Sequence, residues 1–416
     1  MQGYKDSGIE WIGDIPGKWR INKIKYIANL YGRIGWQGLT SDEYVDEGPY
    51  LITGVDFSNG KIDWNNCVHI SEYRWEQADK IKIKNGDLLI TKDGTVGKVA
   101  IVNNLTGKAS LNSGVLLINL NSENNKKFLF WVLCSEVFWT WFNYKNSGNS
   151  TILHLYQKDF NEFNYCMPSV SEQQQIADFL DKECKGIDRI TEKVEKQIEI
   201  LKKYKTSLIT ETVTKGLNKN MKMKDSAVEW IGMIPEDWKV SKVKYNASIK
   251  SGRFLDSADF VDNGNIDVYG ANGKIGSYDK SNINESSILT GRVGTIGTFA
   301  VKENIWITDN VLAIKVDKRS LKFMYYYFHV INFDELSSAT AQPLITASKI
   351  NNLYCLLPEI KEQQQIADFL DKRCSEIDLI LSKKAKQSDI IKEHKKSLIY
   401  EYVTGKKRVG GVENGD

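Results

Sequence analysis

The stretch SEQQQIADFLDKECKGID at residues 171–188 returns almost unchanged as KEQQQIADFLDKRCSEID at residues 361–378, at an offset of 190 residues. A second pair of segments, DSGIEWIGDIPGKWRINKIKYIA at 6–28 and DSAVEWIGMIPEDWKVSKVKYNA at 225–247, matches at an offset of 219. Repetition of this length indicates a tandem duplication of one structural unit. The chain of 416 residues therefore divides near residue 219 into two similar halves.

The regions between the matching segments differ. The offset falls by 29 between the two matches, so the middle of the second half is shorter by that amount. Over residues 52–100 and their counterpart almost no identity remains except a glycine turn, Gly94–Gly97 against Gly294–Gly297. Matching segments that enclose dissimilar regions indicate a common scaffold that presents two different surfaces.

Each glutamine-rich segment is expected to open a long helix. Apolar residues recur every seven positions, and no Gly or Pro interrupts residues 171–215 except Gly186. Gly216 and Gly405 follow the two patterns as expected caps. At about 1.5 Å per residue, each helix would be a rod of roughly 65 Å. The expected seam or partner-interface residues are Ile176, Leu180, Ile187, Val194, Leu201, Leu208, Ile366, Leu370, Ile377, Ile391 and Leu398.

A single apolar stripe on a helix of this length must be covered. The simplest arrangement is that the two rods pack on each other as a coiled coil. The alternative is that each helix docks on another chain, and Lys384, at a seam position of the second helix, leaves room for such contacts.

The divergent region in the middle of each half is expected to form short strands separated by turns, followed by helices. Segments such as Lys82–Lys84, Asp87–Thr91 and Gly114–Leu120 are rich in β-forming residues, and helical stretches follow near 125–142 and 320–336. The predicted class is α+β, with two mixed domains and two long antiparallel helices in an internal repeat. The expected boundaries are residues 1–170 and 217–359 for the two domains, 171–216 and 360–406 for the long helices, and 407–416 for a disordered tail.

Composition excludes several classes of protein. With 41% hydrophobic and 26% charged residues the chain is globular, and no run of about 18 apolar residues or signal-peptide pattern occurs, so we expect a cytoplasmic protein. The six cysteines include no CxxC pair, and the four histidines lie far apart, so neither a disulfide framework nor a metal site is expected. The net charge of +3 neither requires nor excludes nucleic acid.

No motif of a known catalytic or nucleotide-binding site is present. The P-loop pattern, the GxGxxG fingerprint, the GxSxG elbow and the HExxH helix are all absent. The glycines of residues 291–297 resemble a phosphate loop, but glycines between two strands are more typical of a hairpin. Contact of this backbone with DNA phosphate stays the secondary interpretation. The lack of an active site favours a binding or scaffold role.

Basic, amide and aromatic side chains cluster on the turns of both middles. Arginine pairs with guanine and asparagine or glutamine with adenine in the major groove, while lysine neutralises phosphate. The alternative for each residue is a solvated loop position. The DNA-contact candidates are Arg33, Trp36, Gln37, Lys92, Thr95, Lys98, Arg253, Tyr269, Asn272, Lys274 and Arg292.

The duplicated frame resembles one known family. The two EQQQIADFLD segments, each after a proline (Pro168 and Pro358) and each preceded by a variable region with a WIGxIP lead-in, look like the specificity subunit of type I restriction-modification systems. This resemblance implies a non-catalytic DNA reader, whose two domains each bind one half of a bipartite site and whose antiparallel helices set their spacing.

The resemblance also implies the partners. Methyltransferase subunits carrying S-adenosylmethionine would bind around the helices, and restriction subunits that use ATP and Mg²⁺ would join them, with no cofactor in this chain. The alternative class is a non-enzymatic coiled-coil scaffold for protein interactions, in which the lobes bind proteins and not DNA.

Overall fold

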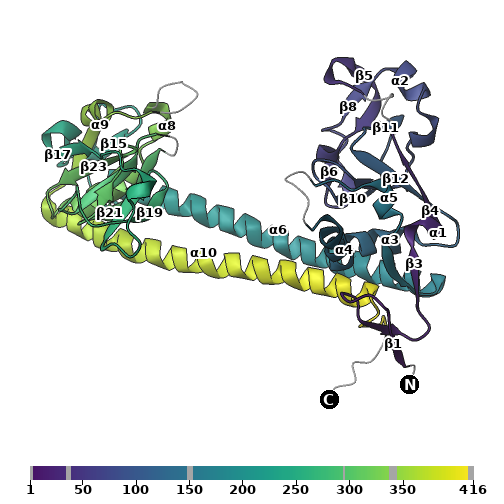
Figure 1. Cartoon of the computed structure of the whole chain (residues 1–416). Helices are drawn as coiled ribbons and strands as arrows, with labels where there is room; N and C mark the ends of the chain where they lie inside the picture. The colour runs from purple at the N-terminus through teal and green to yellow at the C-terminus, as the bar shows by residue number, and fades with distance from the viewer. Residues whose placement is uncertain (1–2, 34–38, 148–152, 294–295, 337–343, 411–416) are drawn as a thin grey trace. The chain divides into compact units, whose positions relative to one another are not determined.

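The computed structural model describes residues 3–33, 39–147, 153–293, 296–336 and 344–410. The chain forms two compact units: unit 1 draws on residues 1–193 and 387–416, and unit 2 on residues 194–386. Two long helices, α6 (Val170–Lys215) and α10 (Ile360–Val403), each contribute a segment to both units. In each unit, small sheets and short helices are built onto this helical pair (Figure 1).

Unit 1 contains, besides its segments of the long helices, β1 (Tyr4–Asp6), β2 (Asp14–Pro16), β3 (Arg20–Lys23), α1 (Ile24–Ile27), β4 (Ala28–Gly32), β5 (Tyr44–Ile52), β6 (Phe57–Ser58), β7 (Lys61–Ile62), β8 (Val68–Ile70), α2 (Glu72–Glu76), β9 (Leu88–Thr91), β10 (Val99–Ile101), β11 (Ala109–Leu111), β12 (Val115–Leu120), α3 (Lys126–Cys134), α4 (Glu136–Asn146), α5 (Gln157–Phe160) and β13 (Asn164–Met167).

Two sheets form the centre of unit 1. One is antiparallel, with strand order β10-β9-β12-β4, and the other has the order β11-β5-β8 with a parallel β11–β5 pair. Every residue of β9 is buried, which explains why this strand is apolar without alternation. The expected strand at 82–84 is reduced to one bridge between Ile83 and Ala109.

Unit 2 contains β14 (Met223–Asp225), β15 (Met233–Pro235), β16 (Lys239–Lys242), β17 (Ala247–Ser251), β18 (Ile266–Gly270), β19 (Gly273–Tyr278), β20 (Ser287–Gly291), β21 (Gly297–Lys302), β22 (Trp306–Ile307), β23 (Val311–Val316), α7 (Leu321–His329), α8 (Phe333–Leu336), α9 (Ala347–Asn352) and β24 (Tyr354–Leu357).

The sheets of unit 2 repeat the topology of unit 1. The antiparallel sheet β21-β20-β23-β17 has the same order as β10-β9-β12-β4, and the sheet β19-β18-β22 again contains a parallel pair, β18–β22. The glycine-rich segment 291–297 joins two antiparallel strands, with Gly291 opposite Gly297, as the hairpin interpretation predicts. The α+β class and the internal repeat are confirmed.

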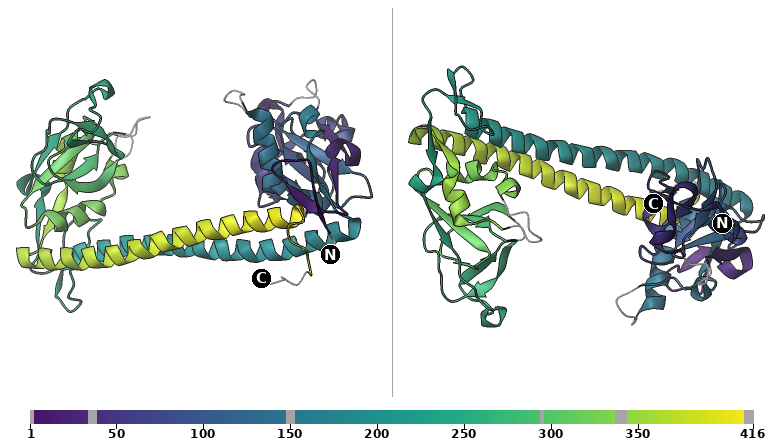
Figure 2. Two further views of the ribbon diagram at one scale, coloured as in Figure 1. Left: turned by 60° about the horizontal axis from the view of Figure 1, so that its bottom comes forward. Right: turned by 90° about the horizontal axis from the view of Figure 1, so that it is seen from above.

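The two long helices run antiparallel in each unit. In unit 1, Lys395 Nζ lies 2.6 Å from Asp188 Oδ1, and the rings of Phe179 and Tyr402 are 4.4 Å apart. The residue with the higher number on α6 therefore pairs with the residue with the lower number on α10. In unit 2 the same order appears in the pair Lys205–Asp378, at 2.7 Å. Both views of Figure 2 show α6 and α10 side by side within each unit.

The predicted seam residues fall into two groups. Those that are buried are Ile176, Leu180, Val194, Ile366, Leu370 and Ile377, and those that are half-buried are Ile187, Leu201, Leu208, Ile391 and Leu398. Lys384, which interrupts the pattern, is half-buried and donates a hydrogen bond of 2.6 Å to Gln197 Oε1. The polar position in the seam is therefore satisfied by a partner on α6.

Both long helices end at a glycine, as predicted. Gly216 and Gly405 each have φ of +73°, the left-handed conformation that a side chain disfavours. Beyond Gly405 the chain stays ordered for a few residues, since Lys407 N donates to Glu401 O at 3.1 Å. Residues 411–416 of the expected tail lie outside the described residues.

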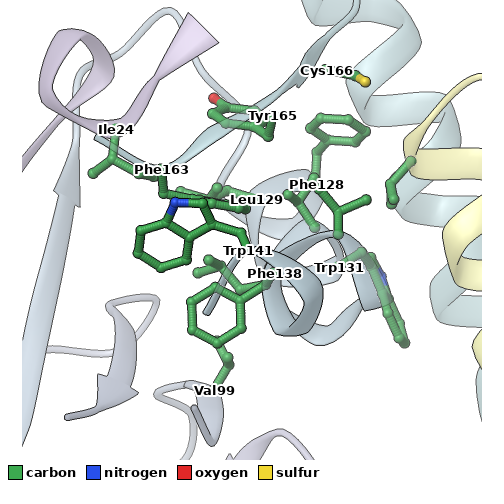
Figure 3. Close-up of a cluster of buried hydrophobic side chains, with 14 of the residues drawn as sticks. Ile24, Val99, Phe128, Leu129, Trp131, Phe138, Trp141, Phe163, Tyr165 and Cys166 are labelled. Atoms are coloured by element: carbon green, nitrogen blue, oxygen red, sulfur yellow. The ribbon is translucent and has the colours of Figure 1, made fainter. Parts of the chain in front are cut away.

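The core of unit 1 is rich in aromatic side chains that pack between its sheet and the long helices (Figure 3). Trp141, 3% exposed, lies 5.0 Å from the ring of Phe163 and 5.8 Å from that of Phe138. Tilted and edge-on pairs of this kind contribute about 0.5–1.5 kcal/mol each beyond the area that they bury. In the same core the short helix α3 is tied to α6, because Trp131 Nε1 donates to Asp181 Oδ1 at 2.9 Å.

Candidate nucleic-acid interface

Loops that follow four strands of unit 2 surround an open hollow of about 580 Å³. These strands are β17, β18, β20 and β22, which belong to two different sheets. The side chains and backbone that line the hollow belong to Phe254, Leu255, Ser257, Phe260, Gly270, Ala271, Asn272, Ile275, Val293, Thr308, Asp309 and Asn310.

A glycine lets two of these loops approach closely. A Cβ at Gly252 would lie 2.1 Å from Thr308 O and 2.4 Å from Ile307 O, distances that no side chain tolerates. Arg253 N then donates to Ile307 O at 3.0 Å, which fixes the start of the loop after β17 beside the end of β22. The side chain of Arg253 is exposed, and the next residue along the chain, Phe254, lines the hollow.

Arg292 holds three loops together. Its Nη1 lies 3.3 Å from both Ser251 Oγ and Asp309 O, and its backbone N–H donates to Asn310 O at 2.9 Å. The side chain is half-buried, so only part of the guanidinium faces solvent. Arg292 thus positions the loops, and its Nε is buried without a hydrogen-bond partner among the described residues.

The other predicted residues of unit 2 differ in exposure. Asn272 is exposed on the turn between β18 and β19, and Lys274 is exposed beside it, with its Nζ 2.6 Å from Asp267 Oδ1. The hydrogen bond that Lys274 donates to Asp267 raises the pKa of Lys274, so this lysine is charged at neutral pH. Tyr269 is only 7% exposed and packs beneath Lys302, whose Nζ lies 5.7 Å from the ring centroid.

The apolar part of this surface was not among the residues predicted from the sequence. Phe254 is 73% exposed and Ile275 is 48% exposed, and both line the hollow. Apolar side chains among arginine, lysine and asparagine are suited to thymine methyl groups or to the faces of bases. The only signal in the sequence is the position of Phe254 next to Arg253 in a glycine-containing loop.

In unit 1 the equivalent loops carry Lys92, Thr95 and Lys98. Leu155 N donates to Lys92 O at 2.9 Å, just as Ile345 N donates to Arg292 O at 2.9 Å in unit 2, so Lys92 and Arg292 occupy matching positions. Thr95 and Lys98 are exposed and both donate to Gly54 O, at 3.0 and 3.5 Å. The structure therefore brings these three predicted residues onto one loop.

Arg33 occupies a structural position. It is 5% exposed, and its Nε and Nη2 donate to Leu111 O at 2.7 Å and Ser110 Oγ at 2.9 Å. Burial, followed by the nearby charge of Arg74, lowers the pKa of Arg33 to about 10. The guanidinium connects the end of β4 to β11 and is not presented to a ligand in this structure. Trp36 and Gln37 lie outside the described residues.

A histidine-carboxylate pair lies beside the Lys92 loop and was not predicted. His154 Nδ1 contacts Asp93 Oδ1, and the His154 ring lies 4.3 Å from that of Tyr156, which is 57% exposed. Asp93 and His154 are 61 positions apart, so no local pattern in the sequence could have paired them.

Among the described residues no group of three or more His, Cys, Asp or Glu side chains could hold a metal ion, and no helix is long and apolar enough to cross a membrane. The six cysteines are free thiols, and burial raises the pKa of Cys355 to about 11, as expected of a packing residue.

A second exposed surface lies on the long helices. Apolar side chains that face solvent include Ile190 and Ile390 in unit 1, and Ile200 and Ile380 in unit 2, each between 43% and 58% exposed. Ile190 and Ile380 are separated by 190 positions, and so are Ile200 and Ile390. The exposed apolar surface is therefore repeated with the internal duplication.

Comparison with known proteins gives one family. Residues 16–200 and 235–387 match the family described as "Type I restriction modification DNA specificity domain". The chain is 28% identical over 446 residues to a putative type I restriction enzyme MjaX specificity subunit of Methanocaldococcus jannaschii, with 98% of this chain and 99% of that protein covered. It is 23% identical to the type I restriction enzyme EcoBI specificity subunit of Escherichia coli, covering 87% of this chain and 80% of that protein.

One solved structure has the same fold. It comes from work described as "Structural basis underlying complex assembly and conformational transition of the type I R-M system", with a TM-score of 0.72 and 14% identity. The match covers 94% of this chain and 99% of the solved chain.

Proposed function

The chain belongs to the family of type I restriction-modification DNA specificity subunits, and from this premise we propose that each of its two lobes reads one half of a bipartite DNA site. As a specificity subunit it is a non-catalytic part of a restriction enzyme and carries no cofactor. We further propose that its paired helices bind methyltransferase subunits, which ATP-dependent restriction subunits then join. A reader of host DNA of this kind works in the cytoplasm.

The observation that carries this proposal is the contrast between a repeated frame and divergent loops. The sheets of the two units have the same strand order, whereas the residues on their loops differ. A duplicated protein that read the same DNA sequence twice would keep both the strand order and the loop residues. Residues 1–170 and 217–359 act in this proposal as the recognition domains, with 171–216 and 360–406 as the helices between them.

The DNA contacts that we propose are the exposed or partly exposed residues of the loops described above. Asparagine matches the edge of adenine and arginine that of guanine, while lysine suits phosphate. The burial of Arg33 and Tyr269 supports a structural role for both. The proposed contacts are Lys92, Thr95, Lys98, Arg253, Asn272, Lys274 and Arg292.

The repeated apolar surface of the helices supports docking of a partner at two equivalent places. Exposed apolar side chains are a common component of protein–protein interfaces when they lie together on one surface. Because Ile190 and Ile380 are equivalent, as are Ile200 and Ile390, each partner would meet the same kind of surface. We therefore propose two copies of one methyltransferase subunit.

The test is reconstitution with the methyltransferase subunit of the same type I system. We expect adenine methylation at one bipartite site, and no methylation by this chain alone. Replacing residues 20–168 by the matching region of another family member should change one half of the site and leave the other. A change in both halves, or methylation without a partner, would contradict the proposal.

Point variants test the proposed contacts. Arg253→Ala and Asn272→Ala should weaken binding to the specific site by roughly 1–3 kcal/mol each, because each loses a base or phosphate contact. Lys280→Ala, an exposed lysine that does not line the hollow, is the matched control. Binding should also fall steeply with salt, which a pure protein-interaction scaffold would not show.

A further inference from the structure

The same glutamine of the repeated EQQQIADFLD segment has different partners in the two units. Gln173 and Gln363 are each 2% exposed, and each donates from Nε2 to the carbonyl of the preceding proline, at 3.0 Å to Pro168 O and 2.9 Å to Pro358 O. In unit 1, Gln173 Oε1 accepts the backbone N–H of Asn125 at 3.0 Å. In unit 2, Gln363 Oε1 is buried and has no hydrogen-bond partner among the described residues.

The difference arises in the loop that precedes the lobe helix. Between β12 and α3 of unit 1 the chain has residues 121–125, whereas between β23 and α7 of unit 2 it has only 317–320. The shorter loop closes on itself, because Ser320 N donates to Asp317 O at 2.9 Å. The donor that satisfies Gln173 therefore has no counterpart for Gln363.

A cavity of about 460 Å³ occupies this region of unit 2. Gln363 lines it, together with the apolar side chains of Val316, Met324 and Leu357. A buried acceptor without a donor is unfavourable, because it has lost its hydrogen bonds to water and gained none in return. The cavity thus combines a size typical of ligand sites with an acceptor that needs a donor.

The edge of the cavity is acidic. Three exposed carboxylates, Asp237, Asp317 and Glu359, line it with one exposed lysine, Lys239. Because Asp317 is also paired with Arg319 at 3.2 Å, the three negative and two positive charges leave a net charge of −1 at neutral pH. Hydrogen bonds from Arg319 lower the pKa of Asp317, so this carboxylate stays ionised. An occupant that donates hydrogen bonds and carries positive charge is favoured.

We propose that this cavity binds an arginine side chain of the methyltransferase partner. Its alkyl chain would contact Met324 and Val316, and its guanidinium would donate to Gln363 Oε1 and to the carboxylates at the edge. The guanidinium is the basic group with five donors in a planar fork, which suits several acceptors at once. The identity of the partner, though not the chemistry of the cavity, rests on the function proposed above.

The position of the cavity on α10 favours a protein partner. Pro358 and Gln363 lie at the start of this helix, and Leu379 and Ile380, 56% and 43% exposed, lie further along it in the same unit. At about 1.5 Å per residue, the seventeen positions from Gln363 to Ile380 span roughly 25 Å. One protein subunit can cover both.

The cavity is tested first on the isolated chain. With ¹³C-labelled methionine methyl groups, Met324 reports on the cavity and the other five methionines serve as controls. N-ethylguanidinium should shift the Met324 signal with saturation in the millimolar range, and neutral N-ethylurea should not. The Asp237→Asn/Glu359→Gln double variant should weaken this binding at least about tenfold, and Asp262→Asn, an exposed carboxylate away from the cavity, should not. No shift, or an equal shift with the urea, would show that the cavity holds only water.

The partner is tested by assembly. The same double variant should bind the methyltransferase subunit about tenfold more weakly, and N-ethylguanidinium should compete with the subunit for the natural chain. If the variant loses the probe but assembles normally, the occupant is a free small cation and the assignment to a partner is wrong. If the natural chain binds the probe but no methyltransferase, the proposed function fails and the cationic site stands.

Discussion

Unit 1 and unit 2 repeat several of their helical contacts at equivalent positions, yet differ in what surrounds these contacts. Asp181 accepts from Lys127 Nζ at 2.7 Å and Trp131 Nε1 at 2.9 Å, and its equivalent, Asp371, accepts from Lys322 Nζ and Tyr326 OH at 2.5 and 2.8 Å. The helix ends, in contrast, meet different neighbours. The duplication has thus preserved these contacts of the long helices. Small changes in loop length and in capping residues alter the groups that lie beside the ends of these helices.

The largest difference between the units in the stability lost on substitution is expected at the two capping glycines. A Cβ at Gly405 would lie 2.5 Å from Pro16 Cδ, whereas a Cβ at Gly216 would lie no closer than 3.1 Å to Glu362 Oε1. Both positions have φ of +73°, so both alanine variants carry backbone strain, but only Gly405→Ala adds a severe overlap. Urea denaturation should give losses of about 2–4 kcal/mol for Gly405→Ala and about 1–2 kcal/mol for Gly216→Ala. Equal losses would contradict the difference in packing.

The second largest difference in stability between the two units is expected at the equivalent glutamines, Gln173 and Gln363. Gln173→Leu removes two hydrogen bonds and leaves Asn125 N–H and Pro168 O without partners, whereas Gln363→Leu removes one bond and an unpaired acceptor. We expect a loss of about 2–3 kcal/mol in the first variant and about 1 kcal/mol or less in the second. Thermal or urea unfolding of the two variants side by side measures this, and a larger loss in Gln363→Leu would refute it.

The glutamates that open the two helices should respond to pH in opposite directions. Burial alone raises the pKa of Glu172, but hydrogen bonds from Ser169 outweigh it and leave that pKa below its ordinary value. Burial raises the pKa of Glu362, and the charges of Asp237 and Glu359 raise it further. Ser169 and Glu359 stand at equivalent positions, which explains why a capping hydroxyl in one unit is a like charge in the other.

The sign of the effect follows from linkage. A lowered pKa stabilises the fold above the ordinary glutamate value, and this stability is lost as pH falls through the lowered pKa. A raised pKa destabilises the fold at high pH, and this cost disappears as pH falls below the ordinary value. At pH 7, Glu172→Gln should therefore lose roughly 0.5–1 kcal/mol and Glu362→Gln should lose nothing or gain slightly. Stability curves between pH 3 and 7 measure both, and parallel curves for the two variants would contradict the prediction.

The smallest effect is expected where the units are alike. Asp188 pairs with Lys395 in unit 1 and Asp378 with Lys205 in unit 2, at 2.6 and 2.7 Å, with all four side chains partly exposed. Ion pairs of this kind contribute little, so Asp188→Asn and Asp378→Asn should each cost less than about 0.5 kcal/mol. The two values should agree within error in urea denaturation at low salt. A clear inequality would mean that the helical frame is not equivalent in the two units.

Much of the frame could be predicted because its signals are local. The heptad spacing of Leu180, Ile187 and Val194 indicates a covered helical stripe, and a glycine after each long pattern indicates where the helix ends. The candidate site was less accessible to such reasoning. Exposure of a loop side chain depends on contacts with residues far along the chain, which is how Arg33 becomes buried through Ser110 and Leu111.

The duplication, the two long helices and the absence of a known catalytic motif follow from the residues alone, because repeats and periodicity are visible in the order of residue types. Which loops meet at the hollow beside Phe254, and which glutamine keeps an unpaired acceptor, depends on contacts between distant parts of the chain. Gln173 and Gln363 stand in nearly identical sequences, yet one is satisfied and the other is not. A hydrogen bond needs its donor at about 3 Å from the acceptor. In unit 1 the donor for Gln173 is Asn125 N–H, 48 positions earlier in the chain, whereas in unit 2 the corresponding loop is one residue shorter and supplies no donor to Gln363.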